Sequence, residues 1–358
     1  MEQFSTMMSN FLWQCHTSEW VISLVCHGVI TGVGSVLSFL PQLTMIFIGT
    51  SFLEASGYMA RVSFVFDKLF KKIGLNGKSI IPFILGTGCS VSGIMATKVI
   101  EEDKERINSI ITTPFIPCSA KLPMITLFTS YFFPKNNAMI AISFYGLSIL
   151  IVIASSLMMK KLFHHTKEEL YIFELPEYQF PSLKYWYKDV KLKVLEFINK
   201  AGTTIFFASI GIWFLLSFST KLEYGVEINH SILAFCGEKI AFLFEPIIGV
   251  KSWEASVSAL QGLIAKEQVI SSMEIIAGLS GEFKSVYEIF HEAGPFHFFT
   301  PASAYAFVAF NLFTTPCVAA ISAMRKELKS FQWFLLAMTY QFLVGWSVAV
   351  VLFHFLNS

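Results

Sequence analysis

Long apolar runs that end at charged residues recur along this chain. Six of them are long enough to cross the roughly 30 Å hydrocarbon core of a bilayer as α-helices. They cover residues 29–53, 107–133, 138–159, 201–219, 302–324 and 332–355. The pattern predicts an all-α fold, that of a polytopic integral membrane protein with about six full spans.

Two further apolar runs carry features that a membrane-crossing helix avoids. Residues 79–99 have glycines around Cys89 and lysines at both flanks, while residues 256–277 contain Lys266 and Glu267. Glycine weakens a helix interior, and an ionisable side chain in hydrocarbon is costly. Because basic residues stay on the cytoplasmic side, lysines at both flanks also argue against a crossing. We therefore expect two re-entrant segments.

The predicted elements repeat in the same order, so the chain divides into two halves. A span, a re-entrant segment and two more spans occupy residues 29–159 and again residues 201–358. The distribution of lysine and arginine predicts that the second copy is inverted. Residues 1–28 contain neither of these residues and are expected to form an extracytoplasmic lead-in, whereas the lysine-rich residues 160–200 are expected to form a cytoplasmic linker.

Residues 77–123 combine charge, glycine, proline and cysteine within an apolar segment. This stretch contains Thr-Pro and Pro-Cys pairs that end at Cys118, and the second half has a similar Thr-Pro-Cys string that ends at Cys317. Proline removes a helical hydrogen bond, so we expect a break in both spans. Inverted repeats whose broken helices meet near the midplane often form a transporter's substrate site. The alternative, that these pairs only kink buried helices, stays open.

Composition agrees with a membrane protein and excludes other classes. Of the 358 residues, 54% are hydrophobic and 14% are charged, and the mean hydropathy of +0.61 is too high for an ordinary soluble domain. The net charge of +1, without an aromatic-interleaved basic tract, gives no reason to expect nucleic acid as a partner. Residues 1–20 lack a basic region and a cleavage site, so no removable signal peptide is expected.

Cys89, Cys118 and Cys317 all lie at interruptions of apolar segments. The thiolate is a soft ligand that suits transition metals better than magnesium or calcium. A single membrane cysteine is more often a small packing residue, and that interpretation stays open for each one. Three cysteines at interruptions favour a shared site, so we predict these side chains as metal ligands.

Glu54 and Glu267 are further candidate metal ligands. A carboxylate within or at the edge of a span tends to mark an ion path or a buried partner. Glu54 could instead cap the helix expected to begin near Tyr58, and Glu267 could form a buried salt bridge. Lys121 either extends toward the interface or neutralises a site, and the sequence leaves both roles open.

Two other features receive no role. The string 74–79 ends like a phosphate-binding loop, but Lys72 stands where that motif needs glycine and no buried strand precedes it. No GTP or ATP site is therefore expected. Cys15, Cys26 and Cys236 lie outside the repeated elements, and a disulfide among them is neither predicted nor excluded.

A set of strings along the chain carries a family resemblance. The strings are Leu53 to Arg61, Gly74 to Pro82, Gly86 to Cys89, Met95 to Lys98, Thr113 to Pro123, Gly262 to Glu267, Thr315 to Ala319 and Tyr340 to Trp346. Together they resemble the membrane region of the ferrous iron transport protein B family, FeoB. The resemblance implies uptake of Fe²⁺ across the bacterial plasma (inner) membrane through two gate segments, here residues 77–123 and 253–278, with Cys89 and its companions as metal contacts.

The resemblance also implies partners. Family members usually begin with a cytoplasmic GTP-binding domain and a first span, and neither is recognised in this sequence. We therefore expect a permease part without enzymatic activity or a permanently bound cofactor, which works with a separate GTP-binding subunit. A small cytoplasmic accessory protein and a homo-oligomer are further expectations. The sequence departs from the family at Ala55, where an acidic residue is usual, and at Ser92, where proline is usual.

Two other functions fit the same sequence. A protein with gate segments could move a nucleoside or another small organic solute, and removal of the three thiols would then change little. It could also be a membrane scaffold, which would form stable complexes but carry no flux. Removal of the thiols therefore discriminates between the metal pathway and these alternatives.

Overall fold

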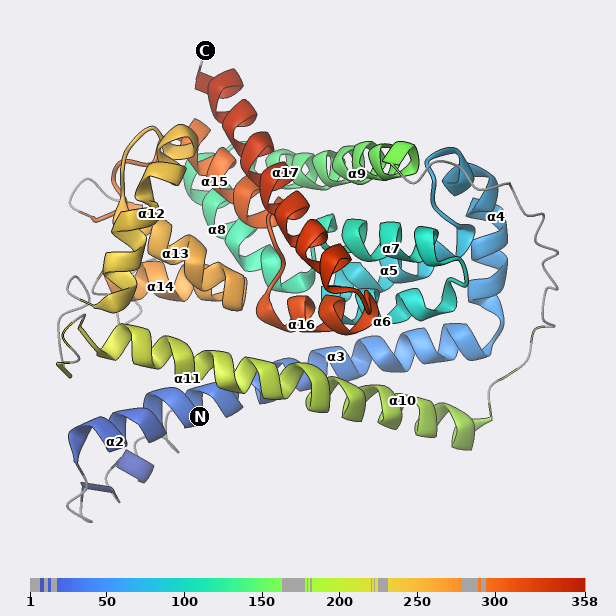
Figure 1. Cartoon of the computed structure of the whole chain (residues 1–358), viewed down its shortest axis with the longest axis horizontal. Coiled ribbons are helices and arrows are strands. Elements are labelled where there is room, and N and C mark those ends of the chain that lie inside the picture. Colours follow the sequence, from blue (N-terminus) through green and yellow to red (C-terminus); the bar gives the residue numbers. More distant parts are fainter. Residues whose placement is uncertain are drawn as a thin grey trace.

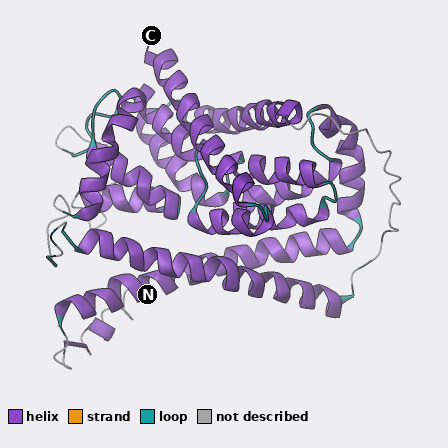
Figure 2. Ribbon diagram, viewed as in Figure 1, coloured by secondary structure: helices purple, strands orange, loops and turns teal. Residues whose placement is uncertain are grey.

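The computed structural model consists mainly of helices. It describes residues 7–9, 12–13, 18–162, 178, 180, 182–219, 221, 223–224, 231–277, 289–290 and 294–357. Within these residues, Figure 2 shows helices joined by loops, and the β-structure is limited to the isolated bridges Phe218–Tyr224 and Ser219–Ser231. The expectation of an all-α fold is confirmed.

The first half of the chain begins and ends with a long helix. α2 (Glu19–Ser23), a π-helical segment (Leu24–Ile30) and α3 (Thr31–Ala55) follow one another without a break, and α9 (Asn137–Leu162) closes the half. Between them lie α4 (Tyr58–Lys72), a pair of short helices and a broken helix. The pair is α5 (Ile80–Gly88) and α6 (Ser90–Ala96), and the broken helix consists of α7 (Asp103–Thr112), the 3₁₀ turns Thr113–Phe115 and Ser119–Lys121, and α8 (Leu122–Phe132).

The second half has the same order of elements. It begins with α10 (Leu183–Phe197), a π-helical segment (Ile198–Gly202) and α11 (Thr203–Ser217), which again follow one another without a break. α12 (Ile232–Ile248), the short pair α13 (Trp253–Ile264) and α14 (Gln268–Ile276), the broken helix α15 (Pro301–Phe313) and α16 (Val318–Glu327), and the unbroken α17 (Phe331–Asn357) come next. The series of long helix, single helix, short pair, broken helix and long helix thus occurs twice.

Each pair of short helices packs as a hairpin with a tight reversal at its tip. A Cβ atom on Gly93 of α6 would lie 2.7 Å from the Pro82 carbonyl oxygen and 3.0 Å from the Gly86 Cα of α5. In the second hairpin, a Cβ atom on Gly262 would lie 2.6 Å from the side chain of Val269. Glycine is required at residue 93, where two backbones approach this closely, whereas at residue 262 it makes room for a side chain. The hairpins occupy the residues that we expected to be re-entrant.

The tips of the two hairpins share one backbone conformation. Cys89, between α5 and α6, has φ −149° and ψ 127°, and Ala265, between α13 and α14, has φ −147° and ψ 128°. The amide nitrogen of each tip residue still donates to a carbonyl oxygen four residues earlier, at 3.0 Å to Leu85 and 3.2 Å to Gln261. A single extended residue therefore ends the first helix of each pair. α6 begins directly after Cys89, whereas Lys266 and Glu267 form a turn before α14.

The two halves meet around the centre of the molecule. In Figure 1, the continuous helices α2–α3 and α10–α11 cross each other along one edge, and α3 packs against both α10 and α11. The group α4–α6 lies at one end of the molecule and the group α12–α14 at the other. In this view α7 lies over the α5–α6 hairpin, whereas α8 and α15 lie toward α12, and α8 packs against α15.

Five helices within the described residues are long and apolar enough to cross a membrane. They are Trp20–Ala55, Asp103–Phe132, Asn137–Leu162, Pro301–Glu327 and Phe331–Asn357. The sixth expected span is the shorter apolar α11, which continues directly from α10. Two helices begin earlier than expected. The first expected span, from residue 29, continues a helix that begins at Glu19, and the span expected from residue 201 continues a helix that begins at Leu183. Apolar runs stop at polar residues, whereas a helix continues as long as its backbone hydrogen bonds form.

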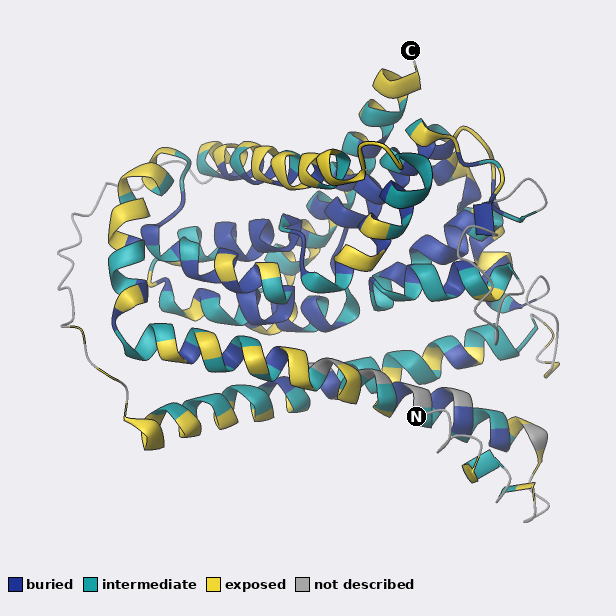
Figure 3. Ribbon diagram, turned by 180° about the vertical axis from the view of Figure 1, so that it is seen from behind, coloured by how far each residue is buried: buried dark blue, intermediate teal, exposed yellow. Residues whose placement is uncertain are grey.

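Apolar residues cover the outside of the molecule as well as its core. Phe307 and Phe313 of α15 are fully buried, whereas Met139 and Ile149 of α9 are 74% and 61% exposed. Figure 3 shows the exposed residues along the outer side of α9. Contiguous exposed apolar surface of this kind marks contact with lipid or with other proteins. Together with the spans, it supports a multi-pass membrane protein.

Candidate functional site

A cavity of about 640 Å³ lies where the hairpin tips, both broken helices and the crossing helices α3 and α11 come together. Its lining includes most of the residues singled out from the sequence, namely Cys89, Cys118, Lys121, Lys266, Glu267 and Cys317. Four of the five predicted metal ligands therefore share one cavity. These four come from both halves of the chain.

Each cysteine of the cavity stands immediately before a helical segment. Cys89 precedes α6, Cys118 precedes the 3₁₀ turn that leads into α8, and Cys317 precedes α16. All three have extended backbone conformations. Cys118 is buried, and the other two thiols are half-buried. The structure thus places the three thiols at breaks in helices, as their sequence neighbours indicated.

The three thiols are neighbours, but they are not gathered into a finished ligand set. Cys118 and Cys317 are both close enough to Cys89 to interact with it electrostatically. Among the described residues, no group of three His, Cys, Asp or Glu side chains is arranged closely enough to hold a metal ion. A cation bound by all three thiols would therefore have to draw their segments together.

Lys121 connects the two broken helices. It is 1% exposed, and its Nζ donates to the carbonyl oxygens of Pro114 at 2.9 Å and Leu312 at 2.7 Å. In an unbroken helix the Leu312 carbonyl would accept from residue 316, which is Pro316 and has no N–H. Lys121 supplies the missing donor. It therefore neither extends toward the interface nor stands unpaired in the cavity.

The tip of the second hairpin brings charge to the cavity. Lys266 is 3% exposed and Glu267 is half-buried, and both line the cavity beside Ala265. Neither forms an ion pair with another residue in the part of the chain that the structure describes. At the same position of the first hairpin, Cys89 is followed by the neutral residue Ser90. The two tips thus offer the cavity different chemistry on the same backbone.

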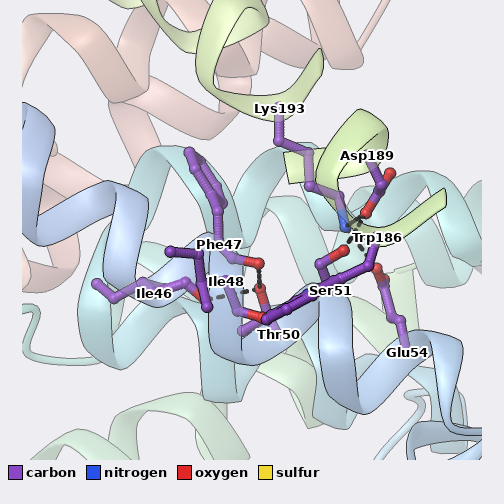
Figure 4. Close-up of polar contacts among 9 residues, drawn as sticks. All are labelled: Ile46, Phe47, Ile48, Thr50, Ser51, Glu54, Trp186, Asp189 and Lys193. Atoms are coloured by element: carbon purple, nitrogen blue, oxygen red, sulfur yellow. Dashed lines mark hydrogen bonds and ion pairs between the residues drawn. The ribbon is translucent and has the colours of Figure 1, made fainter. Parts of the chain in front are cut away.

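Glu54, the fifth predicted ligand, lies outside the cavity at the end of α3 (Figure 4). Its Oε2 is 2.5 Å from Nζ of Lys193, which also lies 2.8 Å from the Asp189 carboxylate. Ser51 donates to Asp189 at 2.5 Å. Burial raises the pKa of Asp189, but hydrogen bonds from Lys193 and Ser51 outweigh this effect and lower it. Glu54 thus belongs to a cluster with Asp189, Lys193 and Ser51 whose ion pairs and hydrogen bond join α10 to α3.

The sequence did not point to the cavity wall formed by α3 and α11. Gln42, Ser209 and Trp213 line this wall, and the indole nitrogen of Trp213 donates to the Ser23 hydroxyl at 2.9 Å. Gln42 follows Pro41 inside an apolar run, and a polar residue beside proline was the available signal. No comparable signal marks Ser209 or Trp213, because serine and tryptophan are ordinary in membrane helices.

Two of the remaining cysteines lie in the described part of the chain. Cys26 is buried and Cys236 is exposed, and no disulfide joins them. Cys15 lies outside the described residues. Neither Cys26 nor Cys236 is among the residues that line the cavity.

Two family models match the chain. The Gate model, described as nucleoside recognition, matches residues 36–132 and 198–331, which together exceed half of the chain. Each of these stretches contains one hairpin and one broken helix. The model described as ferrous iron transport protein B C terminus matches residues 141–192.

Curated relatives match nearly the whole chain. The Fe(2+) transporter FeoB of Staphylococcus aureus (strain COL) is 39% identical over 331 residues, which cover 92% of this chain and 48% of the relative. The Fe(2+) transporter FeoB of Methanocaldococcus jannaschii is 36% identical over 360 residues, with 98% and 52% covered. A Fe(2+) transport protein A/Fe(2+) transporter FeoB fusion protein of Porphyromonas gingivalis is 31% identical over 374 residues, with 92% and 44% covered. No solved structure matches.

The chain spans about half the length of the curated relatives that it matches. The matched part includes both hairpins, both broken helices and the cavity between them. The chain therefore belongs to the Gate family, as a FeoB-type membrane region.

Proposed function

We propose that this chain forms the membrane pathway for Fe²⁺ uptake in the bacterial plasma membrane. The observation that carries the proposal is that Cys89, Cys118, Cys317 and Glu267 line one cavity, although they come from four different elements of both halves. Thiolate sulfur and carboxylate oxygen together suit a borderline divalent cation such as Fe²⁺. The names of the relatives support the same substrate.

The arrangement of the thiols provides a means of binding and release. Cys89 belongs to a hairpin tip, whereas Cys118 and Cys317 belong to the two broken helices. Movement of the hairpin relative to the broken helices changes the spacing of the thiols, and with it the affinity for Fe²⁺. Alternating exposure of the site to the two sides of the membrane follows if the two halves are inverted repeats.

The proposed pathway acts as a permease and performs no chemical reaction of its own. We propose that a separate GTP-binding subunit docks on the cytoplasmic faces around residues 61–78 and 160–200. A small cytoplasmic accessory protein is the second proposed partner. The fusion protein of P. gingivalis supports it, because its name joins a Fe(2+) transport protein A to a Fe(2+) transporter FeoB in one chain. A homo-oligomer is also proposed.

Anaerobic Fe²⁺ uptake into proteoliposomes tests the pathway. The purified full chain is compared with Cys89→Ser, Cys118→Ser and Cys317→Ser, each with and without a candidate GTP-binding subunit. Cys236→Ser is the matched control, because that exposed thiol lies away from the cavity. We expect each cavity variant to lose at least tenfold in uptake and the control to retain it.

The alternative functions predict different results. Equal uptake by the parent and by folded cavity variants would remove the thiols from the pathway. If the parent transports no Fe²⁺ either with or without the GTP-binding subunit, the pathway proposal fails. Flux of a nucleoside or another small solute would then identify a solute transporter. Stable complexes without any flux would identify a scaffold.

A further inference from the structure

Lys266 brings into the cavity an amine that has no ion-pair partner among the described residues. It is 3% exposed and lines the cavity together with Cys118, Cys317 and Lys121. Glu267 follows it directly in the turn before α14, and no ion pair joins the two. Lys121, in contrast, donates to two carbonyl oxygens. Of the two lysines, Lys266 is therefore the one whose amine is available to interact with a cation in the cavity.

We propose that Lys266 sets the cation affinity of the cavity by acting as a tethered positive charge. This inference rests on the proposed Fe²⁺ pathway and adds a residue that sets its affinity for divalent cations. A cation that enters the cavity meets repulsion from the ammonium group in proportion to its own charge. Occupancy then requires compensating bonds to the thiols.

Only some cations can provide that compensation. Hard cations such as Mg²⁺, Ca²⁺ and Mn²⁺ prefer oxygen ligands and gain little from thiolate sulfur, whereas softer transition-metal cations gain more. The ammonium of Lys266 therefore keeps the hard cations below the affinity needed for occupancy. It also weakens the binding of Fe²⁺ itself, so that the cation can leave the cavity on the other side.

A comparison of the tips separates this role from a structural one. The first hairpin has Ser90 directly after its tip residue, where the second has Lys266, and the tip residues Cys89 and Ala265 have nearly equal φ and ψ. The reversal therefore does not need a lysine. A neutral side chain at residue 266 should leave the hairpin folded and change only the charge.

Metal binding by the purified full chain, without any transport step, tests the proposal. The affinity for Co²⁺ is measured anaerobically from its thiolate charge-transfer absorption, and the affinity for Mn²⁺ from the electron paramagnetic resonance signal of the free ion. The variants are Lys266→Met and Lys266→Gln, which remove the charge, and Lys266→Arg, which keeps it. Lys251→Met is the matched control, because Lys251 lies at the start of the same hairpin but is exposed and outside the cavity.

We expect both neutral variants to bind Co²⁺ and Mn²⁺ at least tenfold more tightly than the parent, and Lys266→Arg and Lys251→Met to match the parent within twofold. In proteoliposomes, the neutral variants should have a lower KM for Fe²⁺ uptake together with a lower maximal rate. A merely structural role would lower the rate without lowering KM.

The results that overturn the proposal differ from those that overturn the pathway. Parent-like Co²⁺ and Mn²⁺ affinities in a folded neutral variant overturn the role of Lys266, as does an absence of metal binding by all variants. If the neutral variants bind metal more tightly but neither they nor the parent carry Fe²⁺, the role of Lys266 in binding stands and the pathway fails. Two neutral variants, Lys266→Met and Lys266→Gln, are used so that the test can still be made if one of them fails to fold.

Discussion

The two halves of the chain share a backbone plan but differ in the side chains that they present to the cavity. Each half contributes a hairpin with an extended tip residue and a broken helix with a cysteine at the break. The first tip carries the thiol of Cys89, whereas the second carries Ala265 followed by Lys266 and Glu267. Repetition of the plan thus explains where the cavity lies, and divergence between the tips explains its chemistry.

The largest expected effect concerns Lys121, the contact that joins the halves. Lys121→Met leaves the carbonyl oxygens of Pro114 and Leu312 without their donor. Loss of charged hydrogen bonds in a buried site should lower the free energy of unfolding by about 3 kcal/mol. Denaturant titration in mixed micelles measures this change. Lys135→Met, at an exposed loop residue, is the control and should stay within about 0.5 kcal/mol of the parent.

The next effect compares the packing of the two hairpins. Gly93→Ala forces a Cβ atom against the Pro82 carbonyl oxygen at 2.7 Å and the Gly86 Cα at 3.0 Å, and neither backbone can move independently. Overpacking of this kind should cost about 1–3 kcal/mol of unfolding free energy. Gly262→Ala should cost less, because its closest contact at 2.6 Å is a side-chain methyl group of Val269 and not a backbone atom.

Gly146→Ala completes the hairpin comparison as a control. An added Cβ at this position meets nothing within 4 Å. Because alanine favours the helix over glycine, this variant should be as stable as the parent or up to about 1 kcal/mol more stable. A larger loss of thermal stability in Gly262→Ala than in Gly93→Ala would contradict the difference in packing between the hairpins.

A thiol placed at the second tip sharpens the chemical comparison. Ala265 has the backbone conformation of Cys89 and lines the same cavity, so Ala265→Cys should supply an additional ligand. We expect Co²⁺ to bind about tenfold more tightly, which corresponds to about 1.4 kcal/mol. The double variant Cys89→Ala with Ala265→Cys should bind more tightly than Cys89→Ala alone. Failure of the double variant to do so would show that the tips are not interchangeable.

Local sequence signals predicted the parts of the structure that depend on local backbone chemistry. The glycines around Cys89 and the Thr-Pro strings identified the hairpin and the helix breaks, because glycine and proline act on the backbone where they stand. The partners of charged residues could not be found in this way. Lys121 donates to a carbonyl 191 residues away, and Glu54 pairs with Lys193, 139 residues away. Such contacts depend on how the halves pack.

Glu54 supplies the smallest expected effect and separates the charged cluster from the cavity. Its ion pair with Lys193 is partly exposed, with 33% and 28% of the two side chains accessible, so Glu54→Gln should cost only about 0.5 kcal/mol of unfolding free energy. Co²⁺ affinity should be unchanged, because Glu54 does not line the cavity. Glu267→Gln is the matched comparison within the cavity, and we expect it to weaken Co²⁺ binding. A loss of Co²⁺ affinity in Glu54→Gln equal to that in Glu267→Gln would return Glu54 to the metal pathway and contradict its assignment to the contact between α3 and α10.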